Sequence, residues 1–100
     1  MVQSERDLRQ ELVLEAARRM MVAARTAPKG KGIDVIEIGL VTGEDIKRLS
    51  AEMEHIYRET GFKFLLRDAE NLGSAGAVVI IGTRQQVQAL NCGHCGFPTC

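Results

Sequence analysis

The sequence lacks three features that would assign it at once to a broad class of protein. It has no net charge, because 13 lysine and arginine residues balance 13 aspartate and glutamate residues. A neutral chain has no bulk attraction for nucleic acid or an anionic membrane, so neither is an expected partner. Its longest aliphatic run, Ala77–Ile81, is far too short to cross a bilayer. The polar start Met1–Arg6 has no apolar core of the signal-peptide kind, so we expect a cytoplasmic protein.

Length and composition predict one small folded domain. The chain has 100 residues, of which 45% are hydrophobic, and this excludes an intrinsically disordered chain. A chain of this size buries roughly 65% of its unfolded surface. One small core is therefore expected, but a large enzyme cleft is not.

Hydrophobic periodicity predicts two helices. The first spans about Ser4 to Ala27, with Ser4 as its N-cap, and Pro28 ends it. The second follows Thr42 as N-cap and ends at Gly61, a left-handed terminator. The apolar residues of the first helix form two adjacent rows, Leu8, Leu12, Ala16, Met20 and Ala24, and Val13, Ala17 and Met21.

Three apolar segments predict strands: Ile33–Val41, Phe62–Leu66 and Ala77–Gly82. The first two flank a helix and should be parallel with a right-handed crossover, whereas the third is apolar on both faces and should be central. The fold class is thus α/β or α+β, with at least three strands and two helices in residues 1–90. Residues 91–100 would begin an irregular cysteine-cluster segment. So small a sheet suggests a fragment of a larger domain, and its uncovered apolar surface favours a homodimer.

The cysteines gather at one place in the sequence. Cys92, Cys95 and Cys100 all lie in the last nine residues, with the spacing C-x2-C-x4-C. An odd number of cysteines in a chain without a secretion signal argues against a disulfide framework. Glycine follows each of the first two cysteines, which lets peptide N–H groups approach sulfur. Phe97 and Pro98 would shield one side of the site from water.

Four interpretations of the cysteine segment remain. The first is part of a [4Fe-4S] cluster site that takes three thiolates from this chain. The second is a zinc site, with His94 or an outside residue as fourth ligand, in a zinc-stabilised interaction domain. The third is a redox-active Cys92–Cys95 dithiol. The fourth is a set of free thiols without any ligand.

The cysteine string Cys-Gly-x-Cys-Gly-x-x-x-Cys, with residues 23–32, 66–71 and 77–82, resembles a known family. This is the uncharacterised ferredoxin-domain-containing family of anaerobic bacteria and archaea, and the resemblance spans nearly the whole chain. From the cysteine spacing and the lack of a secretion signal we expect electron transfer or a redox role, with a redox partner protein. The resemblance implies [4Fe-4S] binding by Cys92, Cys95 and Cys100. It implies no reaction. The family motif continues to a fourth cysteine, whereas this sequence stops at the third. Three cysteines can hold a [3Fe-4S] cluster, or a [4Fe-4S] cluster whose fourth iron binds water, a small thiol or a substrate.

A basic, glycine-bearing loop offers a second candidate site. Arg25, Lys29 and Lys31 could cradle a phosphate of a flavin such as FMN. The preceding helix and Ala-Pro turn look somewhat like the early part of the flavin-dependent nitroreductase fold, which implies a flavin-linked oxidoreductase as an alternative. The simpler alternative is a solvated turn.

Two groups of polar residues follow the second and third predicted strands. Ligands gather beyond the carboxyl ends of strands in open α/β sheets, so these groups could line a site. The alternative is a surface turn with an Arg67–Asp68 or Asp68–Arg84 ion pair. Glu37, within the first strand, is expected to be exposed, because an unpaired buried carboxylate would neutralise.

Overall fold

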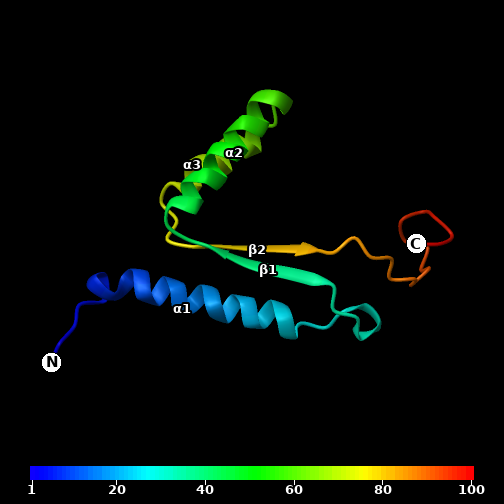
Figure 1. The fold of residues 1–100 in the computed structure, drawn as a ribbon, viewed down its shortest axis with the longest axis horizontal. Helices are drawn as coiled ribbons and strands as arrows, with labels where there is room; N and C mark the ends of the chain where they lie inside the picture. Colours follow the sequence, from blue (N-terminus) through cyan, green and yellow to red (C-terminus); the bar gives the residue numbers. More distant parts are fainter.

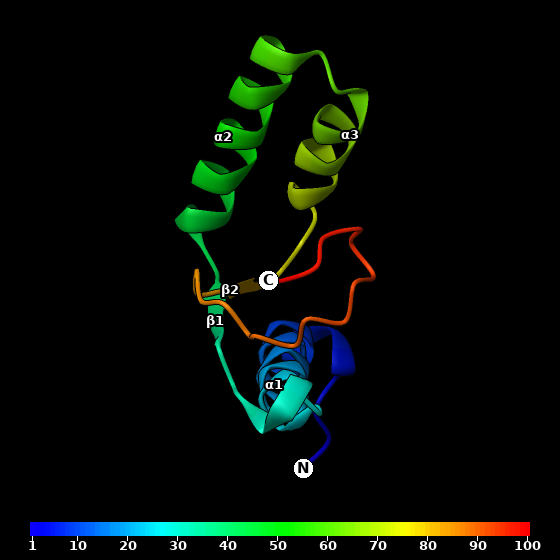
Figure 2. The same cartoon turned by 90° about the vertical axis from the view of Figure 1, so that its right-hand side faces the viewer.

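A computed structural model describes residues 1–100 and has an α+β fold. Its elements, in chain order, are α1 (Glu5–Thr26), a short 3-10 turn η1 (Gly30–Gly32), β1 (Ile36–Val41), α2 (Glu44–Thr60), α3 (Lys63–Leu72) and β2 (Val78–Thr83). The two strands form a ribbon, α1 runs along it, and the α2–α3 hairpin stands away from α1 (Figure 1). Residues after β2 extend beyond the end of the ribbon (Figure 1). A second view shows α2 and α3 side by side (Figure 2).

The first helix is confirmed, together with the signals at its two ends. The Ser4 hydroxyl accepts a hydrogen bond from the backbone N–H of Arg6 at 3.3 Å, as an N-cap does. The helix stops at Thr26, and Ala27 is extended with ψ of 145°. A residue that precedes a proline avoids the helical region, so Pro28 accounts for this end.

The two apolar rows of α1 differ in how far the rest of the chain covers them. Ala17 is buried, with 4% of its surface exposed, and Val13 and Met21 on the same row are partly covered. Leu12 and Met20 lie on the other row and are 44% and 58% exposed. The middle of this second row is therefore exposed, whereas its two end residues, Leu8 and Ala24, are partly covered.

The sheet differs from the prediction of at least three strands. It contains only β1 and β2, which pair antiparallel with Ile38 opposite Ile81. The predicted parallel crossover is therefore wrong. Because α2 and α3 together form a hairpin between the strands, the chain returns in the opposite direction. β2 is not central, and Ile80 and Ile81 are 44% and 56% exposed.

The second predicted strand, Phe62–Leu66, lies mostly in α3. A segment of five residues, four of them apolar, is too short for periodicity to separate strand from helix. The residues that follow it, predicted as a polar connection over 67–76, include good helix formers and continue the helix to Leu72. Ala69 is buried against α2, where the hydroxyl of Ser50 donates to its carbonyl oxygen at 2.8 Å.

The ends of α2 confirm one prediction and correct another. Gly61 has φ of 74° and closes the helix, its N–H donating to the Tyr57 carbonyl at 2.7 Å. The N-cap is Gly43 and not Thr42. Gly43 has φ of 59° and ψ of −136°, a conformation that only glycine adopts readily.

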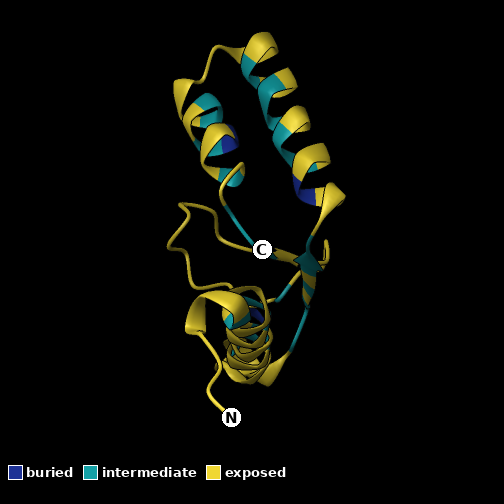
Figure 3. Ribbon diagram, turned by 90° about the vertical axis from the view of Figure 1, so that its left-hand side faces the viewer, coloured by how far each residue is buried: buried dark blue, intermediate teal, exposed yellow.

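The structure has little core. Only Ala17, Ile46 and Ala69 are buried, one in α1 and two in the hairpin (Figure 3). The radius of gyration is 18.1 Å, whereas a compact chain of this length has about 13 Å. None of the three helices combines the length and hydrophobicity needed to cross a membrane.

Candidate functional site

The three cysteines lie on one segment without helix or strand, residues 91–100, which we call the cysteine loop. Its two ends are joined by a reciprocal pair of hydrogen bonds. The backbone N–H of Cys100 donates to Asn91 Oδ1 at 3.0 Å, and the backbone N–H of Asn91 donates to Cys100 Sγ at 3.3 Å. Cys92 and Cys95 therefore lie within a closed loop that ends at the third cysteine.

Left-handed backbone conformations make this closure possible. Gly93 and Gly96 have φ of 74° and 90°, and the N–H of Gly96 donates to the Gly93 carbonyl at 3.0 Å. Asn91 itself has φ of 49°, which asparagine tolerates better than most residues. Sequence reasoning identified the glycines but missed Asn91, whose only signal was its place before the first cysteine.

The donor atoms suit a thiolate-ligated metal centre, although the structure does not gather them. Cys92, Cys95 and Cys100 are free and exposed. No three histidine, cysteine, aspartate or glutamate side chains lie close enough to hold a metal ion in this structure. Phe97, predicted to shield the cysteines, is 68% exposed. Binding a metal or cluster would therefore require the loop to draw its thiols together.

A cavity of about 450 Å³ opens beside Cys100. Residues 84–88, which follow β2, form its other walls. The side-chain amide of Gln88 has a buried nitrogen and a buried oxygen without hydrogen-bond partners. There is thus free volume and unused polar capacity next to the third cysteine.

The segment leading into the cysteine loop is tied to the turn after α1. Lys31 Nζ donates to the carbonyl oxygen of Ala89 at 2.8 Å, across 58 residues of sequence. A Cβ added to Gly30 would lie 3.3 Å from a methyl carbon of Leu90, so these two residues pack closely. Lys31 therefore anchors the start of the cysteine loop in this structure.

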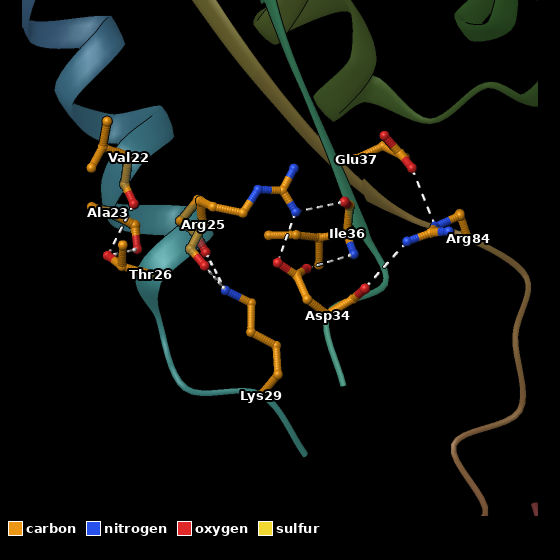
Figure 4. Close-up of polar contacts among 10 residues, drawn as sticks. Val22, Ala23, Arg25, Thr26, Lys29, Asp34, Ile36, Glu37 and Arg84 are labelled. Atoms are coloured by element: carbon orange, nitrogen blue, oxygen red, sulfur yellow. Dashed lines mark hydrogen bonds and ion pairs between the residues drawn. The ribbon is translucent and has the colours of Figure 1, made fainter. Parts of the chain in front are cut away.

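Arg25 and Lys29 are also engaged locally (Figure 4). Arg25 Nη1 lies 2.9 Å from Asp34 Oδ2 and donates to the Ile36 carbonyl at 3.1 Å. The hydrogen bond from Arg25 holds the pKa of Asp34 below its usual range. Lys29 Nζ donates at 2.6 Å to two carbonyls in the last turn of α1, where a cation also suits the helix dipole. Together with Lys31, the three cations have separate partners and do not converge on one phosphate-sized position.

The other polar groups singled out in the sequence form exposed ion pairs. Arg84 Nε lies 3.2 Å from Glu37 Oε1, and Glu37 is exposed as predicted. Arg67 Nε lies 3.1 Å from Asp68 Oδ1, also on the surface. Because Arg67 and Asp68 belong to α3, they do not follow a strand, and the predicted site at a strand end is not formed.

The largest cavity was not foreseen from the sequence. It has a volume of about 580 Å³ and lies between α1 and the α2–α3 hairpin. Gln10 of α1 reaches across and donates to the Gly76 carbonyl at 3.0 Å. The walls of this cavity include Ile46, Lys47, Ser50 and Glu54, but no cysteine or histidine.

Comparison with known proteins gives one relative. The chain is 42% identical over 101 aligned residues to an uncharacterised protein of Archaeoglobus fulgidus. The match takes in all of this chain and 54% of the relative, so the chain spans about half the length of the curated relative. No protein-family model matches the chain, and no solved structure matches it.

Proposed function

We propose that this chain binds an iron–sulfur cluster of the [4Fe-4S] type through Cys92, Cys95 and Cys100, and serves as an electron-transfer or redox module. The observation that carries the proposal is the closed cysteine loop. The pair formed by Asn91 and Cys100 returns the third thiol to the start of the segment that bears the other two. The resemblance to the ferredoxin-domain-containing family supports iron–sulfur binding. The proposal also includes a cytoplasmic location and a redox partner protein.

The residues of the loop have distinct roles in this proposal. The three cysteines, once deprotonated, hold the iron, and the cluster when bound would supply one-electron transfer. The N–H of Asn91 donates to Cys100 Sγ and so stabilises negative charge on that sulfur. Gly93 and Gly96 have positive φ, which glycine adopts without strain, and so allow the turns of the loop.

The number of thiols limits the form of the cluster. Four-iron clusters are ordinarily held by four cysteine thiolates, and this chain supplies three. For the three thiols of residues 1–100, the proposal includes a [3Fe-4S] cluster, or a [4Fe-4S] cluster whose fourth iron takes water, a small thiol, a substrate or a residue outside residues 1–100. The cavity of about 450 Å³ beside Cys100 leaves room for such a group.

Anaerobic reconstitution with iron, sulfide and a thiol reductant tests the proposal. We expect brown protein with charge-transfer absorption, and iron and acid-labile sulfide in the proportion of a [4Fe-4S] or a [3Fe-4S] cluster. Serine variants of Cys92, Cys95 and Cys100 should lose the absorption. A His94→Ala variant is the matched control, because the proposal gives His94 no ligand role. Colourless protein, or zinc bound without sulfide and lost in His94→Ala, contradicts the proposal.

The flavin-linked alternative finds no support in the positions of its residues. Arg25, Lys29 and Lys31 each bind a different part of the chain. A titration of FMN that quenched its fluorescence, and failed to do so with Lys29→Ala, would restore that alternative.

A further inference from the structure

One edge of β2 has no partner. The ribbon has only two strands, so each strand is hydrogen-bonded along one edge and its other edge has no neighbouring strand. The N–H of Arg84 donates to the Val35 carbonyl at 2.8 Å, which makes these two residues a hydrogen-bonded pair of the antiparallel ladder. Hydrogen-bonded and non-hydrogen-bonded pairs alternate along an antiparallel ladder, so Gly82 and Ile80 also bond to β1. The backbone N–H and C=O groups that point to the free edge are those of Val79, Ile81 and Thr83.

The free edge of β1 is protected at Ile36, whereas no outward-pointing group of β2 is protected. At Ile36 of β1, the N–H donates to Asp34 Oδ1 at 3.2 Å and the carbonyl accepts from Arg25 Nη1 at 3.1 Å (Figure 4). β1 also carries the charged residue Glu37. β2 reads Val-Val-Ile-Ile-Gly-Thr, with no charge and no proline, and no side chain bonds to its outward groups. Natural edge strands usually carry such protection, and its absence makes β2 a template for another strand.

The surface left open is large enough for a stable interface. The accessible area of the chain is 7933 Å², whereas a compact monomer of 11.0 kDa exposes about 5,600 Å². The difference of about 2,300 Å² belongs to the whole chain, including the α2–α3 hairpin and the segment after β2, and compares with the roughly 800 Å² that each partner buries in an ordinary stable interface. A two-stranded ribbon is also marginal by itself and gains from further strands.

We propose that β2 pairs antiparallel with β2 of a second copy of this chain, forming a four-stranded sheet in the order β1–β2–β2–β1. Self-pairing of one strand across a two-fold axis requires antiparallel strands. One register satisfies every outward group. In this register, Ile81 lies opposite Ile81 of the second copy, and Val79 lies opposite Thr83. The outward N–H and C=O groups of each of these residues then face the outward groups of its partner in the other β2 strand. This proposal is independent of the iron–sulfur proposal.

The mass in solution is the first test. The full chain should sediment with about twice its monomer mass of 11.0 kDa at micromolar concentration. An Ile81→Pro variant removes an N–H that β1 does not use, and proline is tolerated at such positions on edge strands. The Ile81→Pro variant should sediment with the monomer mass and retain the circular dichroism spectrum of the wild type. Val87→Lys is the control, because Val87 is 68% exposed and lies outside the strand; it should remain dimeric.

Amide hydrogen exchange gives a second test that needs no variant. In the dimer, the amides of Val79, Ile81 and Thr83 should exchange as slowly as those of Ile80 and Gly82, and dilution to the monomer should release only the first set. A wild-type chain that is monomeric overturns the proposal. So does a dimer that survives Ile81→Pro, or one in which the three outward amides exchange freely.

Discussion

Asn91 and Cys100 hold each other across the base of the cysteine loop. The amide oxygen of Asn91 accepts from the Cys100 N–H at 3.0 Å, and the Asn91 N–H donates to Cys100 Sγ at 3.3 Å. The side chain of Asn91 accepts the first bond. The backbone of Asn91, with φ of 49°, orients its N–H for the second bond. One residue therefore sets the position of the third thiol.

Replacing Asn91 by glycine should loosen iron binding. Asn91→Gly deletes the acceptor oxygen but keeps a residue that adopts positive φ without strain. Losing one hydrogen bond of about 1 kcal/mol should weaken iron retention about fivefold, measured by competition with a chelator under anaerobic conditions. Asn91→Asp keeps an acceptor oxygen and should retain iron better than the glycine variant. Equal iron loss in both variants would show that the Asn91 oxygen does not close the loop.

The ion pair of Asp34 and Arg25 should make stability depend on pH on the acid side. The pKa of Asp34 is lowered in the folded chain, first by the hydrogen bond from Arg25. A lowered folded-state pKa stabilises the fold above the unfolded pKa of about 3.9, and this contribution disappears as pH falls through the folded pKa.

Urea unfolding of Asp34→Asn and wild type at several pH values tests this expectation. The variant should be less stable at neutral pH, by a small amount because the pair is partly exposed. The difference should shrink as the pH falls below about 3.9, where Asp34 of the unfolded chain takes up its proton, and disappear once the pH falls through the lower pKa of the folded chain. A difference between the two proteins that stays constant over the whole range would contradict the role of the charge.

Gly61 and Gly39 offer a matched pair of alanine substitutions. A Cβ at either position would meet no other atom within 4 Å, so packing is the same for both. Gly61 has φ of 74°, and alanine there should cost about 1 kcal/mol of unfolding free energy. Gly39→Ala, in β1 without a positive φ, should be neutral or slightly stabilising. Thermal unfolding of the two variants would reveal the difference, and equal stabilities would remove the conformational argument at Gly61.

The first helix could be predicted because its ends depend on residues next to them in the sequence. Ser4 and Pro28 act on neighbouring backbone groups, and Gly61 ends α2 in the same local way. The segment Phe62–Leu66 could not be assigned, because the choice between strand and helix depended on packing against α2. Once this segment is a helix, the third strand and the parallel crossover both disappear.

The sequence shows the positions and spacing of the three cysteines but not the closure of the loop that bears them, and their role as ligands stays a prediction. The spacing of Cys92 and Cys95 indicated metal chemistry, since ligand spacing is a local property. The bond of Lys31 to Ala89 spans 58 residues, so no local pattern could show that this cation is already engaged. The same holds for Arg25, which pairs with Asp34 only because the chain turns back at η1.

The account depends most directly on whether the three thiols hold iron and sulfide together. The decisive measurement is the iron and acid-labile sulfide content of the anaerobically reconstituted chain, compared with a Cys95→Ser variant handled in parallel. We predict iron and sulfide in the proportion of a [4Fe-4S] or [3Fe-4S] cluster in the wild type, and background amounts of both in the variant. Wild-type protein that retains all its thiols in titratable form, with no bound sulfide, would contradict the account.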